Sequence, residues 1–440
     1  MDKSTKIGFG LIALLLGGAA LTMQPKAADK PVETASAKAH LKLASVSTAA
    51  RQNVDYAKLD ARLQRLIEEH SMVGLAIGVV ENGRITFLHG YGETVAGSGE
   101  PVKADTVFRW ASLSKGVAAT MVAKLAEQGK IDLNAPVDVY SASLKLPNGM
   151  ERQATVSDML SHRLGLYRNA YDNKLEEGQD SRVLRSMLGE LNLICAPGTC
   201  WSYQNVAYDG ASEMVEKVSG EPYRDELREQ LFNPIGMSSA TVTREGLESS
   251  KSWARPHDAA QRTLEVNDDY YRVPAAGGVN SNIKDLALWM IAQMGEMPDV
   301  LSPKLLDTLH APLVKTPSEA RRMRKFSERI HDPFYGYGWR SYDYAGHHIV
   351  GHHGGVNGYR STIMFDPVKR SGVVVLWNSN TSQPNGIEVE VMDMIYGLPF
   401  RDWLRLDSSS PHPGVGPVER QEEDETAAVA ARSDSQPTQG

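Results

Sequence analysis

The sequence predicts an α+β fold whose antiparallel sheet is assembled from both ends of the chain. Near the start, residues 73–80 and 84–89 are β-rich runs joined by an Asn-Gly dipeptide, which is a strong hairpin signal. Residues 130–260 look mostly helical, and β-rich segments return after Tyr335. We therefore expect helices flanking one sheet, a helical subdomain inserted at about residues 130–260, and a site where the two meet.

The individual elements follow from periodicity and turn signals. The first helix is predicted at residues 56–70, where leucine and isoleucine recur at helical spacing. A second helix begins at Ser112 and has a glycine stop at Gly129. Later helices are expected at residues 155–162, 209–218, 223–231, 283–294 and 387–396, with a turn at 274–278. The returning strands are expected at residues 349–350, 361–365 and 372–377.

The composition is that of a globular protein. The 440 residues allow one large domain or two ordinary ones, and 41% hydrophobic with 23% charged residues are globular values. A net charge of −7 and a pI near 6.0 argue against a nucleic-acid partner. We expect one folded domain at residues 55–405, followed by a disordered tail at residues 406–440 that is rich in Ser, Pro and Glu.

The N-terminus has the features of an export signal. Lys3 and Lys6 precede an apolar run, so residues 1–23 predict a secretory signal peptide, although the run is long enough to serve as an uncleaved anchor. Residues 24–54 are rich in Ala, Lys and Ser and are expected to be a flexible linker. A periplasmic or extracellular protein follows, with membrane contact only if the segment is retained.

The chain contains two cysteines, Cys195 and Cys200. In an oxidising compartment they could close a small loop, and the alternative is a pair of free thiols. Two thiols without a nearby histidine do not make a zinc site, so we expect no metal.

The candidate nucleophile is Ser112, three residues before Lys115. At the start of a helix this spacing puts both side chains on one face, where the amine can take or relay the hydroxyl proton. Ser-x-x-Lys is the nucleophile motif of β-lactamases and penicillin-binding proteins. The pattern alone is weak, because Ser281 and Lys284 repeat it and Ser112 could instead be an ordinary helix cap.

Further motifs give the first one its context. From Tyr56 to Tyr396 the chain resembles the serine β-lactamase and penicillin-binding protein superfamily, in the branch with class C β-lactamases, D-alanyl-D-alanine carboxypeptidases and related esterases. The family's Tyr-x-Asn motif has three candidates, at residues 167–169, 171–173 and 203–205. We favour Tyr203 and Asn205, because they follow a Pro-Gly-Thr-Cys-Trp-Ser segment that resembles the family's lead-in and precede a predicted helix.

The third motif departs from that of true class C β-lactamases. His352-His353-Gly354-Gly355 resembles the family's His-x-Gly-Gly segment, and no Lys-Thr-Gly occurs in the chain. The rival triplet at residues 370–372 follows an Asp-Pro turn. This pattern is more similar to the carboxypeptidase and esterase relatives. Residues 158–166 resemble a further family block, which we interpret as a structural support.

The resemblance implies acyl transfer without a metal or organic cofactor. Ser112 would attack a carbonyl, and Tyr203, assisted by Lys115, would move its proton to the leaving group. The backbone N–H groups of Ser112 and Gly355 would form the oxyanion hole.

The resemblance also implies three substrate-binding positions. Asn205 would bind a substrate amide, and Gly354 belongs to the strand that lines the substrate. His352 would hold a substrate carboxylate or relay a proton, with a weaker charge than lysine.

These expectations define an exported active-site serine hydrolase that acts through an acyl-enzyme. Its substrates would be D-alanyl peptides, β-lactams or esters, peptidoglycan-derived peptides included. The alternatives are a catalytically silent binding protein of the same fold and a dedicated β-lactamase.

Overall fold

The computed structural model describes residues 53–69 and 72–407. The expected signal peptide, nearly all of the expected linker and the tail from residue 408 onward lie outside the described residues. Among the helices within the described ranges, none combines the length and the apolar character needed to cross a membrane.

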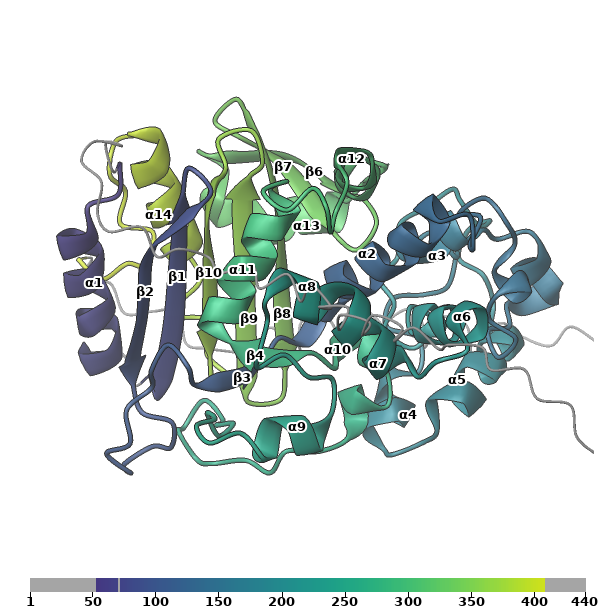
Figure 1. The fold of residues 1–440 in the computed structure, drawn as a ribbon, viewed down its shortest axis with the longest axis horizontal. Helices are drawn as coiled ribbons and strands as arrows, with labels where there is room; N and C mark the ends of the chain where they lie inside the picture. Colours follow the sequence, from purple (N-terminus) through teal and green to yellow (C-terminus); the bar gives the residue numbers. More distant parts are fainter. Residues whose placement is uncertain (1–52, 70–71, 408–440) are drawn as a thin grey trace, which may run out of the picture. The chain divides into compact units, whose positions relative to one another are not determined.

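One antiparallel sheet of eight strands draws its strands from both ends of the chain (Figure 1). The strands are β1 (Gly74–Glu81), β2 (Arg84–Gly92), β5 (Val314–Lys315), β6 (Ile330–Tyr335), β7 (Arg340–Tyr344), β8 (His347–Val356), β9 (Tyr359–Asp366) and β10 (Ser371–Trp377). Their order is β2-β1-β10-β9-β8-β7-β6-β5. Leu75 on β1 lies opposite Trp377 on β10, so the predicted assembly of the sheet is confirmed.

The predicted N-terminal hairpin is also present. β1 and β2 are joined by Asn82 and Gly83, whose φ angles of 53° and 74° are those of the turn that Asn-Gly favours. β5 and β6 were not predicted. β5 has only two residues, and β6 lacks an alternating pattern. It contains Pro333, and its pairing register with β7 shifts between His331 and Phe334.

Helices cover both faces of the sheet. On one face lie α1 (Tyr56–Glu69) and α14 (Ile387–Tyr396), which pack on residues such as Ile77 of β1. On the other face lie α2 (Ser114–Glu127) and α11 (Ile283–Gln293), which share a core with Ala76 of β1. Every residue of β1 is buried, as expected for a strand covered on both sides.

Between β3 (Val107–Arg109) and β4 (Asn280–Asn282), which pair with each other, the chain forms α2 and then a helical segment. Its helices are α3 (Val156–Leu160), α4 (Asp172–Glu176), α5 (Ser181–Met187), α6 (Gly210–Ser219), α7 (Tyr223–Leu227), α8 (Asn233–Ile235), α9 (Arg244–Glu248) and α10 (Pro274–Gly277). The expected turn at residues 274–278 therefore contains one helical turn. Figure 1 shows α3 to α7 gathered beside the sheet rather than on it.

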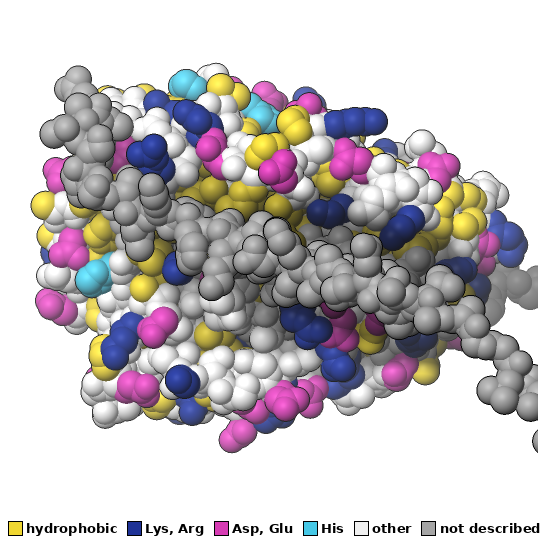
Figure 2. All heavy atoms as spheres, in the orientation of Figure 1, with side chains coloured by type: hydrophobic (Ala, Val, Ile, Leu, Met, Phe, Trp, Pro, Cys, Tyr) yellow, Lys and Arg dark blue, Asp and Glu magenta, His cyan; other side chains and the backbone are white. Residues whose placement is uncertain are grey.

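The two cysteines of this segment are bridged. Cys195 and Cys200 form a disulfide between Cα atoms 6.3 Å apart, which decides between the two alternatives left by the sequence. On the part of the surface that Figure 2 shows outside the grey atoms, Lys and Arg side chains are interspersed with Asp and Glu.

A buried arginine ties the two ends of the folded chain together. Arg62 on α1 donates to Glu390 on α14 at 2.6 Å, and its other nitrogens contact Asp402 and Asp407. The Glu390 side chain is fully buried, so it depends on this cation for compensation of its charge.

Replacing Arg62 by methionine should lower the free energy of unfolding by about 3–5 kcal/mol, because Glu390 would remain as a buried, unpaired carboxylate. Arg65→Met is the matched control: Arg65 also contacts Asp407, but its side chain is 39% exposed, and its loss should cost less than about 1 kcal/mol. Urea unfolding of both variants measures the difference. Equal costs would contradict the role assigned to the buried pair.

Candidate active site

Ser112 lies in a single 3₁₀ turn, Ala111–Leu113, directly before α2. The α-helix thus begins two residues later than the sequence predicted. Ala111 has a φ of 50°, an uncommon left-handed conformation of the kind that clusters at functional sites. Ala111 and Leu113 are buried while Ser112 is partly exposed, so the turn presents the Ser112 hydroxyl outward.

Lys115 in the first turn of α2 is completely buried. Its Nζ lies 3.4 Å from the Ser112 hydroxyl, and it donates to Asn205 Oδ1 at 2.6 Å and to the carbonyl of Ala276 at 3.0 Å. Burial lowers the pKa of Lys115, while the nearby oxygens of Tyr203 and Asp172 partly oppose that shift. The amine is therefore easier to deprotonate than a surface lysine.

The Tyr-x-Asn segment favoured by the sequence is the one that reaches this lysine. The ring centre of Tyr203 lies 4.6 Å from Lys115 Nζ, and the ring is held between those of His162, Trp201 and Tyr335. Tyr203 follows the disulfide-closed loop, which fixes the start of this segment.

Asn205 faces the interior of the protein. Its Oδ1 accepts from Lys115, and its Nδ2 donates to Asp172 at 2.6 Å. Asn205 is buried, so these contacts assign it to holding Lys115 and give no support to the expected contact with a substrate amide. Asp172 comes from the second Tyr-x-Asn candidate, which supplies its central residue to the site.

Four hydrogen bonds fix the state of His352. The backbone N–H of Gln204 donates to His162 Nδ1, which leaves His162 Nε2 to donate to the Tyr335 hydroxyl. That hydroxyl then donates to His352 Nε2, and His352 Nδ1 donates to the carbonyl of His353. All four hydrogen bonds can form together only when the imidazole rings of His162 and His352 are both neutral.

The electrostatics of these histidines agree with their hydrogen bonds. Burial lowers the pKa of His352 well below its ordinary value, and the charges of Arg340 and Lys115 lower it further. The pKa of His162 is lowered for the same reasons. A charged His352 holding a substrate carboxylate does not fit these contacts. Of the two roles expected of His352, holding a carboxylate requires a charged ring, whereas relaying a proton can begin from the neutral ring found here.

Gly354 lets β8 approach the turn that carries Ser112. A Cβ atom at this position would lie 2.4 Å from the carbonyl of Trp110 and 3.0 Å from the backbone nitrogen of Ser112, so no side chain fits. Glycine is therefore needed here for a close contact between strand and turn rather than for binding through a side chain.

The backbone N–H of Gly355 lies on the side of β8 that faces away from β9. Val356 and Tyr359 flank a two-residue turn and form a hydrogen-bonded pair. Hydrogen-bonded and non-hydrogen-bonded pairs alternate along an antiparallel ladder, so the next pair, Gly355 and Arg360, is non-hydrogen-bonded and the N–H of Gly355 points away from β9. On the other side, β7 pairs with β8 only as far as Gly351. Gly355 is exposed, and it follows Gly354, whose backbone lies close to that of Ser112. The oxyanion-hole role of Gly355 stays a prediction.

An ion pair that the sequence did not indicate lies under the aromatic cluster. The guanidinium carbon of Arg340 lies 5.9 Å from the ring centre of Tyr203, and its Nη1 lies 2.7 Å from Glu319 Oε2. Both residues are buried. Burial raises the pKa of Glu319, but the charges of Arg340 and Arg322 and smaller contributions from nearby groups together outweigh burial and lower the pKa, so the carboxyl stays ionised. No motif marks these residues, because their contact depends on the packing of α13 (Pro317–Arg322) against β7.

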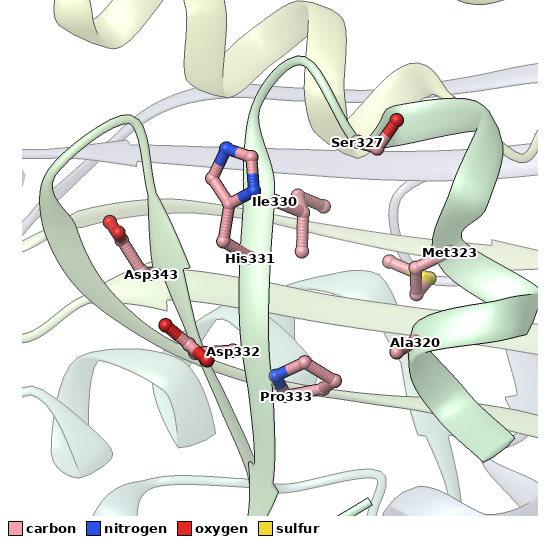
Figure 3. A pocket seen from close by; sticks show the side chains of 8 residues that line it. All are labelled: Ala320, Met323, Ser327, Ile330, His331, Asp332, Pro333 and Asp343. Carbon is pink, nitrogen blue, oxygen red and sulfur yellow. The ribbon is translucent and has the colours of Figure 1, made fainter. Parts of the chain in front are cut away.

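A separate hollow of about 490 Å³ lies between α13, the turn after it and strands β6 and β7 (Figure 3). None of the residues described so far around Ser112 and Lys115 lines it. Its lining residues are Ala320, Met323, Ser327, Ile330, His331, Asp332, Pro333 and Asp343. Within the described part of the chain, no group of three or more His, Cys, Asp or Glu side chains is arranged to hold a metal ion.

This chain is similar to known proteins in sequence and in fold. The chain is 27% identical over 344 residues to the "Unguisins hydrolase ungD'" of Aspergillus campestris, covering 73% of this chain and 60% of that protein. It is 28% identical to the "D-alanyl-D-alanine-carboxypeptidase/endopeptidase AmpH" of Escherichia coli K12, covering 49% of this chain and 56% of that protein. The matched region thus spans little more than half the length of these relatives.

In other comparisons the match covers a larger share of the known protein. "Penicillin-binding protein 4" of Amycolatopsis lactamdurans is 27% identical over 74% of this chain and 85% of its own length. The octameric penicillin-binding protein homologue from Pyrococcus abyssi superposes with a TM-score of 0.70 at 25% identity, covering 78% of each chain. A β-lactamase/D-alanine carboxypeptidase from Pseudomonas syringae has the same fold, with a TM-score of 0.64 at 19% identity, over 79% of this chain and 99% of that one.

The resemblance inferred from the motifs is therefore confirmed over most of the folded chain. Because the Beta-lactamase family profile matches residues 59–391, this chain belongs to the β-lactamase family, whose members include serine hydrolases with carboxypeptidase, esterase and β-lactamase activity.

Proposed function

We propose that this protein is an exported, active serine hydrolase that forms an acyl-enzyme on Ser112. The observation that carries the proposal is the contact of one buried amine, Lys115 Nζ, with the Ser112 hydroxyl at 3.4 Å and with the ring of Tyr203. A binding protein of the same fold would gain nothing from a desolvated lysine in this position, because burial of an amine costs stability. This contact favours the enzyme over the silent alternative.

The reaction follows from the positions of these groups. Ser112 Oγ bonds to the substrate carbonyl carbon, and its proton passes to Tyr203, which must enter this step as a phenolate with the Lys115 ammonium beside it. The carbonyl electrons move onto the oxygen that the N–H groups of Ser112 and Gly355 would bind. The bond to the leaving group then breaks, and the leaving group takes the proton from Tyr203. Water repeats the sequence on the acyl-enzyme and restores the Ser112 hydroxyl.

The electrostatics of the site favour uncharged esters over substrates that carry a carboxylate, which include both β-lactams and peptides ending in a free D-alanine. The position where efficient relatives would place a lysine is filled by His352, which is buried and uncharged. The nearby cation Arg340 is already paired with Glu319. A substrate carboxylate thus meets little uncompensated positive charge on this strand. The Cys195–Cys200 bridge and the apolar N-terminal run support export.

Mass spectrometry after incubation with penicillin tests the nucleophile. The native protein should gain one penicilloyl adduct on Ser112, and Ser112→Ala should gain none and lose hydrolysis of a short-chain p-nitrophenyl ester. Ser281→Ala is the matched control, because Ser281 begins the other Ser-x-x-Lys pattern but is buried and bonded to Trp110 and to a backbone carbonyl. An adduct on the Ser112→Ala protein would refute the assignment.

A second measurement tests the uncharged state of His352. Acylation rates for penicillin and for an uncharged p-nitrophenyl ester, measured from pH 6 to pH 8, should keep a constant ratio, because no histidine charge is lost over that range. A carboxylate held by an imidazolium of pKa ~6.5 would instead lower the penicillin-to-ester ratio roughly 25-fold. His352→Gln should slow both substrates alike. A selective loss of penicillin acylation in that variant would restore the carboxylate role.

A further inference from the structure

Asp172 is brought to the site by an unusual backbone path. Within three residues before it, Asn169 and Tyr171 both adopt left-handed conformations, with φ angles of 53° and 64°. Such conformations are uncommon for residues other than glycine and are kept where the surrounding structure requires them. They bend the chain so that α4 starts at Asp172 with its carboxylate in the interior.

This carboxylate determines which way Asn205 points. Asp172 Oδ2 accepts from Asn205 Nδ2 at 2.6 Å, and an ionised carboxylate can only accept, so the amide oxygen of Asn205 must face the other way. There it accepts from Lys115 Nζ, also at 2.6 Å. The second oxygen of Asp172 is buried and has no hydrogen-bond partner. The fold thus holds the Asp172 carboxylate, with only one of its oxygens hydrogen-bonded, next to the Asn205 amide that contacts the Lys115 amine.

The charges around Asp172 oppose its burial only in part. Burial raises the pKa of Asp172 to about 6, the carboxylate of Glu176 adds to this rise, and the hydrogen bond from Asn205 with the charges of Lys115 and Arg168 limits it. Tyr167 also faces this carboxylate. Asp172 is therefore ionised at neutral pH at a cost to the fold. Its negative charge in turn raises the pKa of Lys115, against the effect of burial.

We propose that Asp172 is a positioning residue for acyl transfer: through Asn205 it holds the Lys115 amine between Ser112 and Tyr203 and keeps that amine charged while Tyr203 moves the proton. This inference rests on the proposed function and adds to it the residue that sets the protonation state of the lysine. It also explains why the fold keeps a buried carboxylate, one oxygen of which accepts no hydrogen bond.

The test is the isosteric variant Asp172→Asn, with pH profiles of kcat and KM for an uncharged p-nitrophenyl ester. We expect kcat to fall roughly 10- to 100-fold with little change in KM, a size typical of lost general acid–base assistance. Losing the negative charge makes the Lys115 ammonium easier to deprotonate, so the alkaline limb should move to lower pH by about one unit or more. The acid limb that Asp172 contributes near its own pKa should disappear.

Stability separates this role from a purely structural one. A carboxyl whose folded pKa is raised opposes folding above that pKa, so Asp172→Asn should be at least as stable as the native protein in urea at pH 8. Glu177→Gln, an exposed carboxyl at the end of the same helix, should change neither rates nor profile.

Three outcomes would overturn the proposal. These are an unfolded or less stable Asp172→Asn protein, a uniform fall in rate with both pH limbs in place, and unchanged kinetics. Failure of the proposed function itself would be seen separately, as ester turnover that survives in Ser112→Ala.

Discussion

The burial of one lysine amine is the constraint on which the site depends. An ammonium removed from water must be satisfied by protein oxygens, and Lys115 finds three of them, on Ser112, Asn205 and Ala276. These residues lie far apart in the sequence. The 3₁₀ turn, the segment after the disulfide and α10 must therefore all be in place before the amine is satisfied, which links the helical segment to the helix that packs on the sheet.

The same amine determines the state of its neighbours. Two buried cations, Lys115 and Arg340, face the histidines, so a proton on His162 or His352 would add a third positive charge to an interior that has little water. The hydrogen-bond chain through Tyr335 provides an alternative in which both rings stay neutral and every ring nitrogen is used. Residues 158–166, interpreted from the sequence as a structural support, thus contribute His162 to the electrostatics of the site.

How much could be predicted depended on the range of the signal. The hairpin at Asn82 and the spacing of Ser112 and Lys115 are local, and the structure contains both. Tyr203 was selected by its lead-in segment, and the structure brings it to Lys115. Asp172 and Arg340 were not predicted, because no local pattern records which buried partner a charged residue will meet. The roles expected of Asn205 and His352 toward a substrate stay predictions. Their contacts with Asp172 and Tyr335 were not predicted for the same reason, because they exist only in the folded chain.

The arrangement of charge also bears on why this third motif can function without a lysine. A fixed cation on β8 would repel Lys115 and Arg340 in the same buried region, whereas a neutral histidine avoids that cost. With Arg340 opposed by Glu319, the proposed function relies for substrate recognition on backbone donors, the N–H groups of Ser112 and Gly355, and on the shape of the surrounding surface. Such donors act on the carbonyl that reacts and not on a distant carboxylate. Under the proposed function, discrimination between acyl groups then comes from packing, which suits neutral esters better than substrates that carry a carboxylate.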